Sequence, residues 1–294
     1  MDLPSPKTSD LHTCPDVDSG QPLAIILKHS PFEETSALVS ACTPTLGLVR
    51  VLAKGIRRPK SPLTSLLNPL VQVRLHFSPR AKRRLADDHL VLVSQAQPVA
   101  SWGALHQNAD ALALGMTLGE VVAHGLKAHD PHAQDVFDAL SQALAGLDAL
   151  VQAAPPDLRE RLVWQAVCGH VALMQAMGVA LVWDTCVVSD APWVWETLPS
   201  VMTFFPALGG VTAASHTATV TEGVRVSVSR STWQTLAQAA VQVAALGVVT
   251  PCPAMLLGAA RPEKLLRFLT YLWQGHLERP LHSMAWAISV LEAP

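Results

Sequence analysis

The sequence predicts an α+β protein in which a small five-stranded barrel is followed by a mainly α-helical domain. Apolar residues alternate with polar ones in short runs from Leu23 to about Gln97, whereas after Pro98 they recur with the period of a helix. The chain has 294 residues, half of them hydrophobic and only 15% charged. A chain of this length and composition can bury a sizeable core, and it suggests about two domains.

The first part of the chain contains short segments with the period of a β-strand. The clearest covers residues 70–77, where Val, Leu and Phe alternate with Gln, Arg and His. Five short strands within about 75 residues favour a small barrel, and the OB-fold is the commonest barrel of this size that binds nucleic acids. The expected strands are Leu23–Lys28, Ala37–Cys42, Leu46–Ala53, Leu70–Phe77 and His89–Ser94.

The second part of the chain is predicted to be helical, with an irregular segment of short strands at residues 183–229. The expected helices are Leu105–Ala128, Ala133–Ala153, Asp157–Met177, Ser231–Leu246 and Pro262–Gly275, with a short one near the end. The predicted division is a flexible polar tail at 1–20, an OB-fold domain at 21–98 and a helical domain at 99–294.

The charges are distributed very unevenly along the chain. Residues 50–86 contain ten Lys or Arg and no acid, although the whole chain has a formal net charge of −2. Such a block is typical of polyanion binding. The alternative is that these residues form merely solvated turns.

The basic residues form two clusters that are expected in loops after the third and fourth strands. Gly55 and Pro59 predict a loop for the first cluster. The clusters could converge on one groove that neutralises phosphates and releases counterions. Few aromatic residues are available for base stacking, so weak sequence preference is expected. The predicted DNA-binding residues are Lys54, Arg57, Arg58 and Lys60, then Arg74, then Arg80, Lys82, Arg83 and Arg84.

Other features argue for a protein of the reducing cytoplasm. Five scattered cysteines without C-x-x-C spacing make a disulfide framework improbable. The apolar stretches Leu162–Trp183 and Thr232–Val249 are interrupted by Gln and His, which favours core helices over membrane spans. The first twenty residues lack the apolar run of a signal peptide.

Several short motifs resemble those of the RecO family of recombination mediators. The most specific is Ala53-Lys-Gly-Ile-Arg-Arg-Pro-Lys-Ser61, preceded by Thr43-Pro-Thr-Leu-Gly-Leu48 and followed by Leu67-Asn-Pro-Leu70. A fainter resemblance continues to Tyr271-Leu-Trp-Gln-Gly-His-Leu-Glu-Arg-Pro-Leu281, so that about residues 22–285 are covered.

The resemblance implies a non-enzymatic protein of DNA repair, associated with the nucleoid, that needs no cofactor. Such proteins bind single- and double-stranded DNA, anneal complementary strands and bind RecR. With RecR, and in some bacteria RecF, they load recombinase on strands coated by single-strand-binding protein. The acidic tail of that protein is expected to bind the helical domain, and the available cations are Lys127, Arg159, Arg161, Lys264 and Arg267.

One departure from the family concerns zinc. Many members hold a zinc ion with four cysteines, and the corresponding positions here are taken to be Cys186, Ser189, Ala213 and His216. Two candidate ligands are too few for a closed structural site, so no metal is predicted.

Other polar groups have a structural interpretation that is favoured over a catalytic or metal site. They are a turn at Asp87-Asp88-His89, a helix cap at His129-Asp130-Pro131-His132, a buried pair at Cys168 and His170, and core filling by Trp183, Trp193 and Trp195. No P-loop motif occurs.

Three functional hypotheses follow. The first is a DNA-binding and annealing mediator. The second is a protein-interaction adaptor whose basic loops bind acidic partner surfaces, with incidental DNA contact. The third is a nuclease, which would need a cluster of metal-binding carboxylates that the sequence does not contain in recognisable form.

Overall fold

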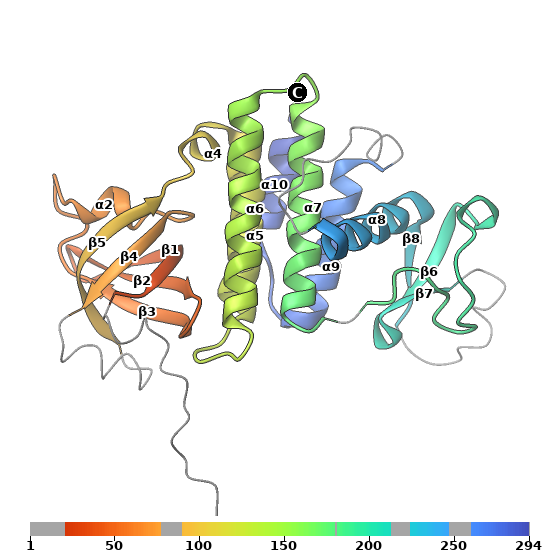
Figure 1. Cartoon of the computed structure of the whole chain (residues 1–294), viewed down its shortest axis with the longest axis horizontal. Helices are drawn as coiled ribbons and strands as arrows, with labels where there is room; N and C mark the ends of the chain where they lie inside the picture. The colour runs from red at the N-terminus through yellow and green to blue at the C-terminus, as the bar shows by residue number, and fades with distance from the viewer. Residues whose placement is uncertain (1–20, 78–89, 180, 213–223, 247–259, 294) are drawn as a thin grey trace, which may run out of the picture.

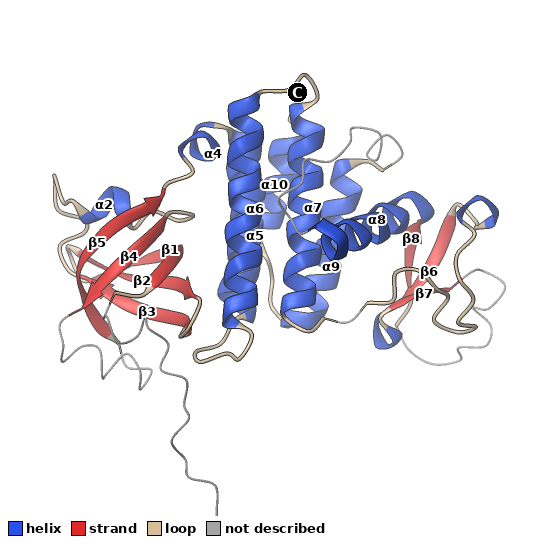
Figure 2. Ribbon diagram, viewed as in Figure 1, coloured by secondary structure: helices blue, strands red, loops and turns tan. Residues whose placement is uncertain are grey.

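The computed structural model describes residues 21–77, 90–179, 181–212, 224–246 and 260–293. A β-barrel forms one end of the elongated molecule, a helical body forms its middle, and a small sheet forms the other end (Figures 1 and 2). The predicted fold class, an OB-type barrel followed by a mainly helical domain, is confirmed.

Five strands close the barrel in the order β1-β2-β3-β5-β4. All neighbouring pairs are antiparallel except β3 and β5, which pair in parallel, with Val51 opposite Val91. A single-turn helix, α2 (Leu63–Leu66), precedes β4. This strand order, with a helix between the third and fourth strands, is that of an OB-fold. The strands are β1 (Leu23–Phe32), β2 (Ser36–Thr43), β3 (Gly47–Ala53), β4 (Gln72–Phe77) and β5 (Val91–Ala100).

The alternation of side chains in β1 joins the barrel to the helical body. Ala24 and Ile26 point into the barrel core, which Ile56 and Leu67 close at the end that carries α2. The next residues, Ile25 and Leu27, belong instead to the core of the helical domain. One strand therefore contributes to both cores, because successive side chains of a strand point to opposite faces.

The helices that pack against the barrel are α5 (Ala109–Gly125) and α6 (Ala133–Ala153), which contact its first strands. Long helices pack side by side around a core of Leu, Val and Trp (Figure 1). The remaining helices are α4 (Gly103–Gln107), α7 (Leu158–Ala176), α8 (Arg230–Leu246), α9 (Pro262–Leu277) and α10 (His282–Glu292).

Several predicted boundaries differ from the structure. The single helix expected over Leu105–Ala128 is wrong, because Asn108 adopts an extended backbone conformation and separates α4 from α5. The Asn108 side chain accepts a hydrogen bond from the Ala111 backbone N–H at 2.9 Å, and so caps α5. Strand β5 also runs longer than expected, through Pro98 to Ala100.

The segment predicted to be irregular contains a three-stranded sheet in the order β7-β6-β8. The sheet packs on the helical core through aromatic residues, because Phe204 of β6 lies 5.7 Å from Trp233 of α8, ring centroid to ring centroid. Trp183, which precedes the sheet, also packs on Trp233, at a centroid distance of 4.8 Å. The elements of this part are η1 (Trp195–Thr197), β6 (Val201–Phe205), η2 (Pro206–Leu208), β7 (Gly210–Thr212) and β8 (Val226–Ser229).

Among the described residues, every helix is too short or too polar to cross a bilayer.

Candidate nucleic-acid interface

The first basic cluster forms a well-defined loop between β3 and α2, at the barrel end farthest from the helical body (Figure 1). Ile56 anchors the loop because its side chain is 5% exposed and packs in the barrel core. Its backbone carbonyl accepts a hydrogen bond from the Thr64 hydroxyl at 2.5 Å. Gly55 and Lys60 adopt left-handed backbone conformations, with φ of 70° and 65°. The loop is therefore held by its backbone, while its charged side chains project outward.

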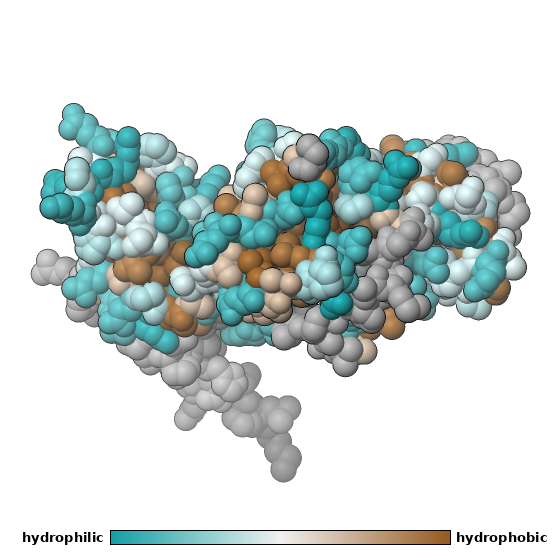
Figure 3. All heavy atoms as spheres, turned by 90° about the horizontal axis from the view of Figure 1, so that it is seen from above, coloured by the Kyte–Doolittle hydropathy of each residue, from teal (hydrophilic) through white to brown (hydrophobic). Residues whose placement is uncertain are grey.

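The four cations of the loop are all exposed to solvent. Among the residues that the structure describes, no carboxylate lies within ion-pair distance of any of them. Hydrophilic residues also predominate at this end of the molecule (Figure 3). Exposed cations without a carboxylate partner remain available to an external anion. These cations are Lys54, Arg57, Arg58 and Lys60, which hereafter are called the β3 loop cations.

The fold brings two acids to the neighbourhood of this loop. The Arg57 backbone N–H donates to the Thr35 carbonyl at 3.0 Å, which ties the loop to the hairpin between β1 and β2. Glu33 and Glu34 lie in that hairpin and are exposed. The basic block is therefore less isolated in space than along the sequence, because the sequence separates these acids from the cluster by about twenty residues.

Arg74 lies on β4, as the alternation of that strand predicts, but it is half-buried. Its guanidinium donates a hydrogen bond to the Gln21 carbonyl at 3.1 Å. Part of its hydrogen-bonding capacity thus holds the start of the described chain against the barrel.

The second basic cluster, Arg80, Lys82, Arg83 and Arg84, lies outside the described residues, as does Asp87-Asp88-His89. The predicted convergence of the two clusters on one groove stays a prediction.

Few aromatic side chains are available on the described part of the barrel for base stacking. Phe77 is 8% exposed and points into the barrel core, and Trp102 is 7% exposed at the junction with the helices. Phe32, at the end of β1, is half-buried. Contacts to the backbone of a nucleic acid are therefore more accessible to this surface than stacking on its bases.

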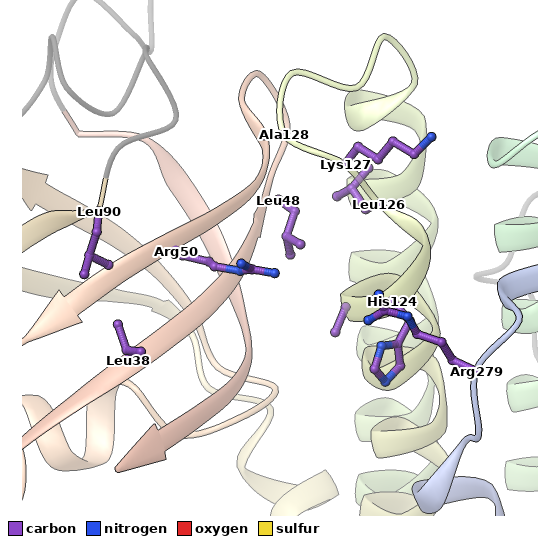
Figure 4. A pocket seen from close by; sticks show the side chains of 10 residues that line it. Leu38, Leu48, Arg50, Leu90, His124, Leu126, Lys127, Ala128 and Arg279 are labelled. Atoms are coloured by element: carbon purple, nitrogen blue, oxygen red, sulfur yellow. The ribbon is translucent and has the colours of Figure 1, made fainter. Parts of the chain in front are cut away.

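A second cationic surface, which the sequence did not predict as a site, lies between the barrel and the helical body (Figure 4). It is a cleft of about 530 Å³. Arg50 extends from β3 towards His124 of α5 and Arg279, which lies between α9 and α10, and Lys127 stands at the rim. The remaining lining is apolar or small, namely Leu38, Leu48, Leu90, Ala123, Leu126 and Ala128. We call this site the interdomain cleft.

Close backbone contacts at one point hold the two walls of the cleft together. The Leu48 N–H donates to the Lys127 carbonyl at 3.0 Å, and the His129 N–H donates to the Leu46 carbonyl at 2.9 Å. Gly47, with a φ of 66°, lies at this junction, and a Cβ atom there would stand 2.2 Å from the Lys127 carbonyl oxygen. Only glycine allows both this conformation and this approach.

His124 lies among charges of both signs. Burial lowers the pKa of His124, and Lys28, Arg279 and His282 lower it further, while Glu120 opposes them. The Glu120 carboxylate lies 3.8 Å from the His124 ring, but it also accepts hydrogen bonds from the His282 and Ser283 backbone N–H groups. Its charge is thus already engaged at the N-terminus of α10.

The other polar groups singled out in the sequence have structural partners. Asp130 accepts a hydrogen bond from the His132 N–H at 3.0 Å. His170 is fully buried between Thr117 and Trp273, with its Nε2 2.9 Å from the Thr117 hydroxyl oxygen. Trp183, Trp193 and Trp195 pack against the helical core. No cluster of potential metal ligands occurs among the residues that are described.

The segment that corresponds to the family's zinc site is partly described. Cys186 is buried, and its N–H donates to the Ala191 carbonyl at 2.9 Å, which closes a tight turn that also contains Ser189. Ala213 and His216 lie outside the described residues, so the predicted absence of zinc stays a prediction.

The five cations considered for an acidic tail differ in their surroundings. Arg159, Arg161 and Arg267 form ion pairs with Asp110, Asp157 and Glu292. Lys127 stands at the rim of the interdomain cleft, and Lys264 lines a groove with Phe268 and Tyr271.

The described fold is an OB-type barrel followed by a helical domain. The sequence profile of the family described as "Recombination protein O N terminal" matches residues 21–102, which are the barrel and the two residues that follow β5. Proteins named "DNA repair protein RecO" are similar over a longer stretch. The protein from Idiomarina loihiensis is 29% identical over 196 residues, which are 65% of this chain and 73% of that protein.

Two further relatives with the same name extend the comparison. The protein from Nitrosospira multiformis is 30% identical over 171 residues, 58% of this chain and 62% of that protein. The protein from Salinibacter ruber is 27% identical over 157 residues, 53% of this chain and 55% of that protein. The match thus spans less than two thirds of these two relatives. The chain is thus similar to proteins of the RecO family, and its barrel is the most firmly matched part.

Proposed function

We propose that this protein is a non-enzymatic DNA-binding and strand-annealing mediator of recombination in DNA repair. The observation that carries the proposal is the β3 loop, in which four exposed cations without a described carboxylate partner project from an OB-type barrel. The barrel matches the N-terminal family of RecO, and the relatives are named as DNA repair proteins.

Backbone neutralisation gives annealing a physical basis. Phosphate contacts release condensed counterions and lower the repulsion between two complementary strands, and this requires no ATP. The scarcity of exposed aromatic residues on the described barrel supports weak sequence preference. Arg74 and the second basic cluster, Arg80, Lys82, Arg83 and Arg84, are proposed as further phosphate contacts.

The test is the salt dependence of affinity for a labelled single strand. We expect Arg57→Gln with Arg58→Gln to flatten the slope of log affinity against log salt by about 1.4, since each phosphate contact on a single strand contributes about 0.7. Arg261→Gln with Lys264→Gln is the matched control, because it removes two exposed charges from α9 and its start. An unchanged slope in the loop variant would remove the loop from the interface.

The proposed partners, by resemblance, are RecR, the acidic tail of single-strand-binding protein and, in some bacteria, RecF. For the tail, the groove beside β8 is favoured by its chemistry, because Lys264 and Arg267 adjoin Phe268, Tyr271 and exposed Val201. Titration of an acidic, aromatic-ended peptide against Lys264→Gln tests this placement, with Arg261→Gln as control. Equal affinity for both variants would contradict it.

The second candidate function is a protein-interaction adaptor. The observation that favours it is the pair Glu33 and Glu34 beside the loop, because their negative charges repel the phosphates of DNA. Titration of single strands with and without RecR separates the two functions. DNA affinity that exists only in the presence of RecR would favour the adaptor. Magnesium-dependent cleavage of DNA would favour the third hypothesis, a nuclease.

A further inference from the structure

We propose that the interdomain cleft is a second binding site for the phosphate backbone of a single nucleic-acid strand, separate from the β3 loop. The inference rests on the proposed function, because it assumes that nucleic acid is the ligand of this protein.

The first support is the arrangement of cations on opposite walls. Arg50 extends from β3 of the barrel, and Arg279 extends towards it from the connection between α9 and α10, with His124 of α5 beside Arg279 (Figure 4). Both arginines are exposed, and no carboxylate lines the described cleft. A guanidinium binds phosphate oxygens through two parallel hydrogen bonds, so two of them across a gap suit a phosphodiester backbone.

The second support is that the walls are fixed before any ligand binds. The backbone hydrogen bonds between Leu48 and Lys127 and between Leu46 and His129 join β3 to the connection between α5 and α6. Gly47 allows the close approach on which these hydrogen bonds depend. Cations that are already positioned lose little conformational freedom on binding, which favours affinity.

The size and lining of the cleft indicate which form of nucleic acid fits. A volume of about 530 Å³ is that of a site for a small ligand, so the cleft admits a few nucleotides of one strand rather than a duplex. Leu38, Leu48 and Leu126 provide apolar surface for sugars and base edges. The cations are spread along the lining instead of converging on one point, which fits an extended polyanion better than a compact ion.

The position of the cleft also indicates what it adds to the loop. The β3 loop lies at the barrel end away from the helices, whereas the cleft lies where the barrel meets α5 (Figure 1). Two separate backbone sites on one molecule can hold a longer strand than either alone. We therefore expect the cleft to matter for long strands and the loop to matter for strands of any length.

The experiment uses the full chain with Arg50→Gln, Lys127→Gln and Arg279→Gln combined, which we call the cleft variant. Its three side chains are exposed and form no ion pair among the described residues, so the fold should be retained and a thermal melt checks this. The control combines Arg159→Gln, Arg225→Gln and Arg261→Gln, which removes the same number of exposed charges at positions that do not line the cleft. The probes are oligothymidylates of graded length.

We expect the cleft variant to bind short oligothymidylates like the unmodified protein, and to bind long ones with a salt slope reduced by about 2. The control should bind short oligothymidylates like the unmodified protein and should keep its salt slope on long ones. Equal slopes of the cleft variant and the control on long strands would overturn the inference and leave the proposed function intact. If instead the loop variant Arg57→Gln with Arg58→Gln binds every length normally, the proposed function fails.

A competition with polyglutamate separates nucleic acid from an acidic protein as the occupant. We expect polyglutamate to displace long oligothymidylate only at a large excess. If polyglutamate binds the unmodified protein more tightly than oligothymidylate, and the cleft variant loses only that binding, the cleft is a protein-docking site and the inference is wrong.

Discussion

The β3 loop and the interdomain cleft present similar cations but are built in different ways. The loop gathers Lys54, Arg57, Arg58 and Lys60 from seven consecutive positions, and all of its anchors lie within the barrel domain. The cleft gathers Arg50, Lys127 and Arg279 from three segments far apart in the sequence, and it depends on the docking of the barrel against the helices. Local charge density thus reveals one surface, whereas only the fold reveals the other.

The largest expected effect comes from Gly47→Ala, which breaks the cleft and spares the loop. The new Cβ would stand 2.2 Å from the Lys127 carbonyl oxygen at a φ of 66°, so the junction must shift. We expect a loss of about 3 kcal/mol in the free energy of unfolding, measured by denaturant titration.

Gly55→Ala is the matched control for this substitution. Gly55 also has a positive φ, of 70°, but its Cβ would meet only the flexible Arg58 side chain at 3.4 Å. A loss of about 1 kcal/mol is expected here. Equal losses in the two variants would show that the junction is not close-packed in solution.

The next largest effect concerns His170, which is buried in the helical body behind the cleft. Thr117 donates its hydroxyl proton to the Leu114 carbonyl, so His170 donates through Nε2 to Thr117 and accepts through Nδ1 from the Trp273 indole. This neutral ring links α5, α7 and α9. Burial lowers the pKa of His170 from 6.5 to about 3.

The sign of the pH dependence follows from this shift. The unfolded chain binds a proton at His170 below about pH 6.5, whereas the folded chain does so only near pH 3, so stability is complete above 6.5 and falls on acidification. The expected loss from this group is about 2 kcal/mol at pH 5.

The measurement compares denaturant unfolding between pH 5 and 7.5 for the unmodified protein and His170→Gln. The variant should be less stable at pH 7.5 but should lose less on acidification. His29→Gln, at an exposed position of β1, serves as control and should keep the full pH dependence. Parallel pH curves for His170→Gln and the unmodified protein would show that His170 is not held neutral in the core.

The smallest expected effect is the influence of the hairpin acids on the affinity of the loop for DNA. Glu33 and Glu34 lie in the hairpin to which Arg57 is tied, and their charges oppose an incoming phosphate. We expect Glu33→Gln with Glu34→Gln to raise single-strand affinity about two- to fivefold at low salt. In the background of Arg57→Gln with Arg58→Gln, the gain should shrink. A gain of the same size in both backgrounds would show that the acids act on the strand independently of the loop.

The sequence predicted the barrel and most helices because alternation and helical period are local signals. It missed the break at Asn108, since a single capping residue inside an apolar pattern resembles a helix interior. It also missed the proximity of the hairpin acids and the cleft, because the cleft joins Arg50 of the basic block to Lys127 and Arg279 from distant parts of the sequence. Contacts between distant segments, such as Gly47 with Lys127, can be recognised only in the folded chain.

The most direct test of two separate backbone sites is one salt series with a long oligothymidylate and four proteins. These are the unmodified chain, Arg57→Gln with Arg58→Gln, the cleft variant, and all five substitutions combined. We predict that the two reductions in salt slope add in the combined protein, because the sites contact different phosphates. If the salt slope of the combined protein equals that of the unmodified chain, neither the β3 loop nor the interdomain cleft contacts phosphates of the strand.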